Sequence, residues 1–280
     1  MSDAVSFEGR VALVTGASRE IGAAMAAALA ARGAAVVVSH HREPALAEDT
    51  AARIRAAGAT ALVHECDCTR VDEVRAMVAR TVRELGRLDL CVANAGVTVW
   101  GPFLEYEERQ WDAVVDLNLK GSFFLAQAAA REMIRQGTPG SIVFSSSIAG
   151  VRSIPYLAAY GVTKAGLGHM ARCLAVELGT HLIAVNALGI GPTVNARNLA
   201  DDPDYDARWG AVSPAGRAAR PEDIARALVF LVENPYVTGE TIVVDGGWTA
   251  TSRTPPLEFV ERRRDEHERQ SRKAPPGEAQ

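Results

Sequence analysis

A serine, a tyrosine and a lysine whose spacing suits proton transfer stand in the middle of this 280-residue chain. Tyr160 and Lys164 are four positions apart, so on a helix they share one face about one turn apart. Ser147 lies thirteen residues before Tyr160 and follows the apolar run 141–144, which predicts a buried strand. A cation beside a phenol favours the phenolate, and such a phenol can exchange a proton with an oxygen whose carbon exchanges hydride. The three side chains therefore predict acid–base chemistry at a carbonyl or hydroxyl carbon.

A glycine-bearing turn near the start of the chain predicts a phosphate-binding site. The short apolar strand expected at 10–14 runs into a turn with Gly16 and Gly22, and an Ala-rich helix is expected at 21–32. A turn between a strand and a helix presents backbone N–H groups, and the helix N-terminus adds a partial positive charge. The sequence thus predicts that phosphates bind at this turn.

Further motifs follow in order along the chain. An Asn-Ala-Gly turn at 94–96 follows the strand expected at 88–92, and Asn118 stands within a predicted helix. With the glycine turn and the Ser, Tyr and Lys set, they resemble the short-chain dehydrogenase/reductase family of the Ser-Tyr-Lys-Asn type, over roughly residues 7–250. The resemblance implies a Rossmann fold, an α/β doubly wound parallel sheet of about seven strands with helices on both faces. Strands and helices alternate along the chain as such a sheet requires.

The resemblance implies an oxidoreductase that interconverts a ketone and a secondary alcohol by hydride transfer with an NAD(P) cofactor. Tyr160 would be the general acid/base, and Ser147 would hydrogen-bond the reacting oxygen. Lys164 would lower the pKa of Tyr160 and bind the nicotinamide ribose, while Asn118 would hold a water that relays protons to Lys164. Besides Tyr160 and Lys164, the implied cofactor-binding set comprises Gly16, Ser18, Arg19, Ile21, Gly22, His40, His41, Arg42, Asp67, Cys68, Asn94, Ala95, Gly96, Gly191 and Thr193.

The end of the second expected strand favours NADP(H) over NAD(H). An acidic residue there would accept hydrogen bonds from the ribose hydroxyls and repel a 2′-phosphate. The chain carries His40, His41 and Arg42 instead, and Arg19 stands in the glycine turn. All four side chains are neutral or positive. Since an arginine–phosphate contact is a charge-assisted pair, the sequence predicts that the 2′-phosphate of NADP(H) is bound.

Two departures from the family pattern bear on the cofactor. Glu20 stands where the family usually has a glycine, and its carboxylate would repel the pyrophosphate. We therefore expect weakened rather than abolished cofactor binding. Ile190 replaces the usual proline before Gly191, and the threonine that usually binds the carboxamide has Thr193 and Asn195 as candidate replacements.

The sequence predicts one domain over 1–250 and a distinct tail. The segment 189–219 breaks the strand–helix rhythm with three prolines, and its position in the family implies a substrate lid. After residue 250, the mixed-charge run predicts that 251–280 is a disordered, solvated tail, with a subunit-spanning arm as the alternative. Besides Ser147, the side chains expected to contact the substrate are Trp100, Ile154, Tyr156, Asn198 and Trp209.

The aromatic and apolar character of these side chains favours a ring or alkyl ketone, and the sequence leaves the substrate itself open. A 3-oxoacyl-carrier-protein reductase and a sugar 1-dehydrogenase are alternative activities. A non-catalytic NADP(H)-binding regulator is an alternative of another class. Glu20 is its one supporting feature, and the intact set of Asn118, Ser147, Tyr160 and Lys164 argues against it.

Composition and charge exclude several classes of function. A net charge of −4 gives no reason to expect a nucleic-acid partner. The sequence has no apolar stretch of 18 or more residues and no signal-peptide core, so a cytoplasmic protein without a membrane contact is expected. Its 4 cysteines lack CxxC spacing and its histidines are scattered, so no metal site is expected. The resemblance, with Ala- and Leu-rich helices expected at 106–136 and 156–179, implies a homotetramer.

Overall fold

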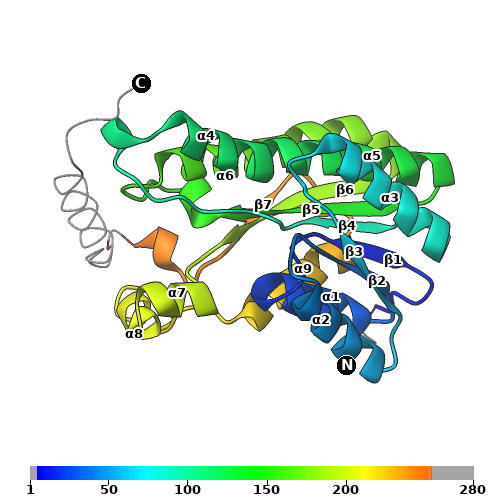
Figure 1. The fold of residues 1–280 in the computed structure, drawn as a ribbon, viewed down its shortest axis with the longest axis horizontal. Helices are drawn as coiled ribbons and strands as arrows, with labels where there is room; N and C mark the ends of the chain where they lie inside the picture. Colours follow the sequence, from blue (N-terminus) through cyan, green and yellow to red (C-terminus); the bar gives the residue numbers. More distant parts are fainter. Residues whose placement is uncertain (1–4, 252, 254–280) are drawn as a thin grey trace, which may run out of the picture.

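Seven parallel strands form the centre of the fold (Figure 1). The computed structural model describes residues 5–251 and 253 of the chain. The sheet has the order β3-β2-β1-β4-β5-β6-β7, so β1 to β3 extend to one side of the boundary between β1 and β4, and β4 to β7 extend to the other side. The strands are β1 (Val11–Val14), β2 (Ala35–His40), β3 (Ala61–Glu65), β4 (Leu90–Ala93), β5 (Gly140–Ser147), β6 (Ile183–Ile190) and β7 (Thr241–Val244).

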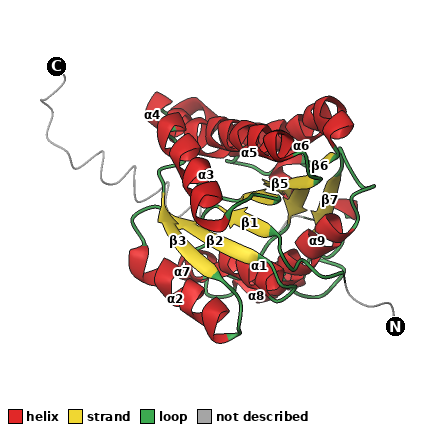
Figure 2. Ribbon diagram, turned by 90° about the vertical axis from the view of Figure 1, so that its right-hand side faces the viewer, coloured by secondary structure: helices red, strands yellow, loops and turns green. Residues whose placement is uncertain are grey.

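Helices cover both faces of the sheet, as Figures 1 and 2 show. One face carries α1, α2 and α9, and the other carries α3, α5 and α6, with α4 beside α6. The helices are α1 (Glu20–Ala30), α2 (Pro44–Ala56), α3 (Val71–Leu85), α4 (Glu108–Val115), α5 (Ser122–Gln136), α6 (Ala158–Leu178), α7 (Ala196–Asp201), α8 (Tyr205–Gly210) and α9 (Pro221–Glu233). Short 3₁₀ turns are η1 (Phe103–Glu105), η3 (Ile148–Gly150), η4 (Gly179–His181) and η5 (Trp248–Ala250).

Each face of the sheet packs its own apolar core. The core beneath α1, α2 and α9 includes Met25, Leu29 and Leu228, and the core beneath α3, α5 and α6 includes Leu125 and Met133. All four residues of β1 are buried, as expected for a parallel strand that has helices on both sides. The doubly wound α/β fold that the sequence predicts is confirmed.

The helix expected over 106–136 is not α-helical throughout. α4 ends at Val115, a π-helical segment η2 spans Asp116–Gly121, and α5 begins at Ser122. Apolar periodicity runs through the junction, so the sequence carries no mark of the change. The π-helical segment buries Asn118 completely. Single π-helical turns inside α-helices are frequent at functional sites.

The segment 189–219, expected as an irregular lid, contains two short helices. After β6 ends at Ile190, α7 and α8 follow beyond the carboxyl ends of the strands (Figure 1). Trp209 of α8 packs edge to face on Trp248, with ring centroids 5.6 Å apart, and Ile148 belongs to the same buried cluster. This cluster fixes the segment, called the α7–α8 segment below, onto the edge of the sheet.

Three further expectations concern the tail, a membrane contact and a metal site. The tail expected at 251–280 lies outside the described residues apart from 251 and 253. Within the described residues, no helix combines the length and the apolar character needed to cross a membrane. The same part of the chain holds no group of three or more His, Cys, Asp or Glu side chains arranged to bind a metal ion.

Candidate active site

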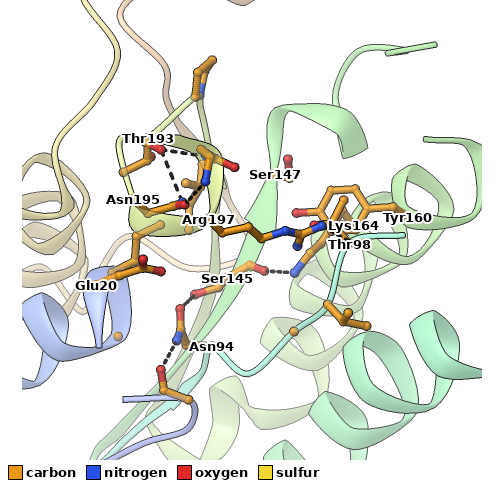
Figure 3. A pocket seen from close by; sticks show the side chains of 18 of the residues that line it. Glu20, Asn94, Thr98, Ser145, Ser147, Tyr160, Lys164, Thr193, Asn195 and Arg197 are labelled. Carbon is orange, nitrogen blue, oxygen red and sulfur yellow. Dashed lines mark hydrogen bonds between the residues drawn. The ribbon is translucent and has the colours of Figure 1, made fainter. Parts of the chain in front are cut away.

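A cavity of about 530 Å³ lies at the carboxyl ends of the strands, between the glycine turn and the α7–α8 segment (Figure 3). Open parallel sheets bind ligands at this edge, beside the point where the strand order reverses. The structure brings most of the predicted residues to this cavity. Its lining includes Gly16, Ser18, Arg19, Ile21, Gly22, Asn94, Ala95, Gly96, Ser147, Tyr160, Lys164, Gly191 and Thr193, and from the expected substrate set Trp100, Ile154, Asn198 and Trp209.

Tyr160 and Ser147 meet inside this cavity. Ser147 ends β5 and Tyr160 lies in the first turn of α6, so strand, loop and helix bring the two residues together. Burial raises the pKa of the Tyr160 phenol, and the Ser147 and Thr98 hydroxyls and the Arg197 guanidinium oppose that rise. At neutral pH the phenol therefore holds its proton and can donate it. Ser147 Oγ accepts the Ala149 N–H at 3.1 Å, which leaves its own proton free to donate.

Lys164 follows Tyr160 by one helical turn and is buried. Its Nζ donates a hydrogen bond to the Ser145 carbonyl at 2.6 Å and lies 5.4 Å from the centroid of the Tyr160 ring. Burial lowers the pKa of the ammonium to about 8, because the charged form loses its hydration. The positive charge beside the phenol ring therefore decreases as the pH rises through about 8.

Asn118 holds the loop after β4 in place. Its Nδ2 donates to the Val97 carbonyl at 2.9 Å, and its Oδ1 accepts the Val97 N–H at 2.8 Å. The side chain is completely buried and lies outside the cavity lining, so it acts on the site through this loop. A Cβ on Gly96 would lie 3.1 Å from Asn118 Oδ1 and 3.4 Å from Lys164 Nζ. The glycine thus lets the asparagine and the lysine approach the same backbone.

The glycine turn forms a cradle that fits the phosphates of a dinucleotide. Gly16 has a φ of 61°, in the left-handed region that favours glycine. A Cβ on Gly22 would lie 2.1 Å from the Gly16 carbonyl oxygen, so the start of α1 packs against the turn only because this residue is glycine. Within the described chain, no side chain caps the N-terminus of α1. Its first N–H groups therefore remain available to an anion.

Hydrogen bonds join the glycine turn to the side of the cavity that holds the predicted catalytic residues. Thr15 Oγ1 accepts the N–H groups of Asn94 and Ala95 at 3.0 and 3.1 Å. Asn94 Nδ2 donates to the Thr15 and Gly16 carbonyls at 2.9 and 3.1 Å. Asn94 Oδ1 accepts the Ser145 hydroxyl at 3.0 Å, and the Ser145 carbonyl accepts a hydrogen bond from Lys164 Nζ. The phosphate-binding turn and the predicted catalytic residues therefore belong to one network.

Glu20, the departure in the glycine turn, contacts the opposite wall of the cavity. Its backbone φ of 54° lies in the left-handed region, which is costly for a residue with a Cβ. Its Oε1 accepts the N–H of Ala196, the first residue of α7, at 2.7 Å. The carboxylate therefore joins the glycine turn to the α7–α8 segment.

The end of β2 differs from the sequence prediction. His40 is buried, and its Nδ1 accepts the Glu43 N–H at 3.2 Å, so its ring supports the following turn instead of facing the cavity. His41 and Arg42 are exposed and also lie outside the lining of this cavity. Arg42 has a φ of 57°, so the chain bends sharply away from the strand direction at this point. The side chain that lines the cavity here is Glu43.

Three other predicted residues also lie outside this lining. Asp67 Oδ1 accepts the N–H and the hydroxyl of Thr69 at 3.0 and 2.7 Å. Cys68 is buried in the core beneath α3, α5 and α6. Tyr156 has a φ of 65°, and its carbonyl accepts the Gly101 N–H at 3.0 Å. Local turn geometry keeps Asp67 and Tyr156 out of the cavity lining, and core packing does the same for Cys68. Their positions in the sequence do not reveal these contacts.

Sequence reasoning missed several residues of the lining, among them the four polar residues Glu43, Thr98, Arg197 and Tyr205. Glu43 accepts the Ser18 hydroxyl at 2.5 Å and pairs with the Arg19 guanidinium at 2.9 Å. Burial raises the pKa of the Tyr205 phenol. None of the four belongs to a spaced motif, because the fold alone brings them to the cavity. For Glu43 a signal was present, since it is the first acidic residue after β2.

Comparisons with known proteins identify the family. A family model described as enoyl-(acyl carrier protein) reductase matches residues 16–249. The 2-dehydro-3-deoxy-D-gluconate 5-dehydrogenase of Escherichia coli (strain K12) is 37% identical over 251 residues, which cover 88% of this chain and 98% of the relative. The cis-4-hydroxycyclohexanecarboxylate dehydrogenase of Sinomonas cyclohexanicum is 39% identical over 248 residues, which cover 88% of this chain and 98% of the relative.

The fold of this chain is similar to that of a solved structure over most of its length. The short-chain type dehydrogenase/reductase from Mycobacterium marinum superposes with a TM-score of 0.84 at 35% identity, over 89% of this chain and 99% of that chain. These similarities span the glycine turn, the Ser, Tyr and Lys set and the α7–α8 segment. The chain belongs to the short-chain dehydrogenase/reductase family, whose members are NAD(P)-binding oxidoreductases.

Proposed function

We propose that this protein is an NADP(H)-dependent oxidoreductase that interconverts a ketone and a secondary alcohol. The observation that carries the proposal is the partly buried Tyr160 phenol, which shares one cavity with the Ser147 hydroxyl and the glycine turn. A protonated phenol beside a second hydroxyl suits the protonation of an oxygen on which negative charge grows. The two curated relatives are named for a gluconate derivative and a hydroxycyclohexanecarboxylate, which supports a small substrate with a hydroxyl or keto group.

The residues of this chain handle the proton, and a bound nicotinamide supplies or accepts the hydride. In ketone reduction, Tyr160 donates its proton to the carbonyl oxygen while Ser147 donates a hydrogen bond to the same oxygen. The Lys164 ammonium, packed beside the phenol ring, stabilises the phenolate that remains. In alcohol oxidation, Tyr160 takes the proton back as a general base. Asn118 is a positioning residue that keeps the loop after β4 in place.

The cofactor would lie along the hydrogen-bonded network that joins the two ends of the cavity. The free N–H groups at the start of α1, beside Gly16 and Gly22, would hold its phosphates. Lys164 would bind the nicotinamide ribose and Thr193 the carboxamide. Glu20 opposes this binding, because a carboxylate beside the phosphates repels them.

The preference for NADP(H) over NAD(H) depends on the charges near Ser18. Arg19 lines the cavity, and its side chain is half exposed, so it can reach a 2′-phosphate. His41 and Arg42 are exposed at the end of β2 and lie outside the cavity lining, where they add no negative charge. Glu43 opposes the preference, since it already holds Arg19 at 2.9 Å and a 2′-phosphate must replace it. We therefore propose a moderate preference for NADP(H).

A panel of ring and alkyl ketones, assayed with NADPH and with NADH, tests the function and the cofactor separately. We expect reduction of at least one ketone, followed by the loss of reduced-nicotinamide absorbance, and a higher kcat/KM for NADPH. A kcat/KM that favours NADH would contradict the cofactor preference and leave the reaction intact. Nucleotide binding without turnover of any ketone or of the matching alcohols would favour a non-catalytic regulator.

The α7–α8 segment is proposed as the substrate lid. Asn198 of α7 and Trp209 of α8 line the cavity, and the segment joins the glycine turn through the Glu20 contact with Ala196. A segment that contacts both the phosphate-binding turn and the substrate end can move in response to either ligand. During this movement, the Trp209–Trp248 contact would keep the α8 end of the segment packed against the sheet.

We also propose a homotetramer. Large apolar side chains are exposed on α4, α5 and α6, among them Trp111, Phe123, Val162 and Val176. Monomeric proteins rarely leave several large apolar side chains exposed on neighbouring helices, since their burial between subunits is favourable. Light scattering of the purified protein should give a mass about four times the 29.8 kDa of one chain. A mass equal to that of one chain at micromolar concentration would contradict the tetramer.

A further inference from the structure

Arg197 brings a positive charge to the substrate end of the cavity. It is the second residue of α7, and its side chain extends from the α7–α8 segment toward Tyr160 and Lys164 (Figure 3). Its Nη2 donates a hydrogen bond to the Thr98 carbonyl at 2.9 Å. The Arg197 side chain therefore crosses the cavity from α7 to the loop after β4. Its guanidinium lies near the Tyr160 phenol.

The other cations of this cavity already have partners. Arg19 pairs with the Glu43 carboxylate at 2.9 Å, and Lys164 Nζ donates to the Ser145 carbonyl at 2.6 Å. Across the described residues, Arg197 forms no ion pair with a carboxylate. A guanidinium has five N–H donors, so the bond to Thr98 leaves most of them free. An unneutralised arginine that faces a substrate cavity is a binding site for an anionic group.

A structural role for Arg197 does not account for its charge. Any neutral donor of similar length could reach the Thr98 carbonyl and hold α7 in place. The charge does reach the reacting groups, because the guanidinium opposes the rise in the pKa of Tyr160. Since the Arg197 side chain is exposed at the cavity mouth, an anionic group bound there keeps part of its hydration. The site can therefore bind a charge without a large desolvation cost.

We propose that the substrate carries a carboxylate that binds the Arg197 guanidinium, a proposal that rests on the ketone–alcohol chemistry proposed above. A planar guanidinium fork donates two parallel N–H bonds to a carboxylate. One cation balances one negative charge, which favours a monocarboxylate over a phosphate that carries nearly two. Trp100, Ile154 and Trp209 line the cavity and would contact the carbon skeleton between the two functional groups. The substrate class is thus a keto acid or hydroxy acid with a compact apolar skeleton.

Calorimetric titration tests this proposal without turnover. Cyclohexanecarboxylate and cyclohexanecarboxamide have nearly the same shape, differ in charge, and lack a keto group. In the presence of excess NADP⁺, the parent protein should bind the carboxylate about tenfold more tightly than the carboxamide. Arg197→Gln should remove this difference by weakening only the carboxylate. Arg197→Lys keeps the charge but not the planar fork, so it should retain part of the difference.

Arg226→Gln is the matched control. Arg226 is exposed on α9, pairs with Asp223 and lies outside the cavity lining, so its loss should leave both affinities unchanged. Equal binding of the two ligands by the parent protein would overturn the proposal. Equal weakening of both ligands by Arg197→Gln would overturn it too, because that result indicates a structural role.

A turnover assay with 4-oxocyclohexanecarboxylate and its methyl ester adds a second readout. The parent kcat/KM should be higher for the acid, and Arg197→Gln should lower the acid-to-ester ratio about tenfold, mainly through KM. The ratio cancels any general effect of the guanidinium on Tyr160. Reduction of both ketones without a preference for the acid would contradict the carboxylate site and support the proposed reaction. Tight carboxylate binding with no reduction of either ketone would contradict the reaction and support the Arg197 site.

Discussion

Tyr160→Phe should lower ketone reduction by about 10²–10⁴-fold, the usual contribution of a positioned general acid. The substitution removes only the phenol oxygen, and the remaining ring can still pack beside the Lys164 ammonium, 5.4 Å from the ring centroid in the parent. Burial keeps the parent phenol protonated at neutral pH, so the hydroxyl is the acid that reduction requires. We therefore expect kcat to fall, with little change in nucleotide affinity or thermal stability.

Tyr236→Phe serves as the control for this experiment. Tyr236 is fully exposed, so the loss of its hydroxyl should change neither turnover nor folding. Steady-state rates with the best ketone of the panel, nucleotide titration and thermal unfolding give the three readouts. A Tyr160→Phe enzyme that keeps more than half of the parent rate would show that another group donates the proton.

Gly22→Ala should both destabilise the protein and weaken cofactor binding by about tenfold or more. Its new Cβ would lie 2.1 Å from the Gly16 carbonyl oxygen and 2.9 Å from Ala17 Cα. Both neighbours are backbone atoms that cannot rotate away, so the turn or the start of α1 must move. Overpacking of this kind costs about 1–3 kcal/mol, and the displaced N–H groups would no longer meet the phosphates together.

Gly179→Ala provides the matched control, because Gly179 has helical dihedrals, with φ −59°, and its added Cβ would meet no neighbouring atom within 4 Å. Alanine there should be neutral or stabilise the protein by up to about 1 kcal/mol. Thermal unfolding with and without NADPH measures both effects at once, since a ligand that binds the native state raises its stability. If NADPH stabilised Gly22→Ala as much as the parent, the phosphates would not lie on this turn.

The meeting of the tyrosine, the lysine and the glycine turn in one cavity could be predicted because local geometry determines most of it. Tyr160 and Lys164 share a face of one helix, and Gly16 and Gly22 bound a strand–turn–helix unit. The regular alternation of strands and helices then places the carboxyl ends of all strands at one edge. The same alternation could not indicate the π-helical segment that holds Asn118, because the apolar pattern continues through it.

Contacts between segments far apart in the chain could not be predicted. Arg197 reaches Thr98 across 99 positions, and Glu20 reaches Ala196 across 176. Neither contact follows from periodicity, because both depend on the path of the α7–α8 segment over the cavity. The burial of His40 has a similar cause, since its ring bonds to the turn that follows β2.

The Glu20 contact with α7 has a consequence for the kinetics of cofactor exchange. In the cofactor-binding mode proposed above, the carboxylate would repel a pyrophosphate and lower the equilibrium affinity, yet its bond to the Ala196 N–H resists separation of the two cavity walls. One such hydrogen bond is worth about 1 kcal/mol, which would slow opening of the cavity roughly fivefold and so slow both the entry and the release of the cofactor. Affinity and residence time would then be separated, so that a nucleotide with low equilibrium affinity would still leave the cavity slowly. Ketones of very different intrinsic reactivity should then approach a common kcat, set by the departure of the oxidised cofactor.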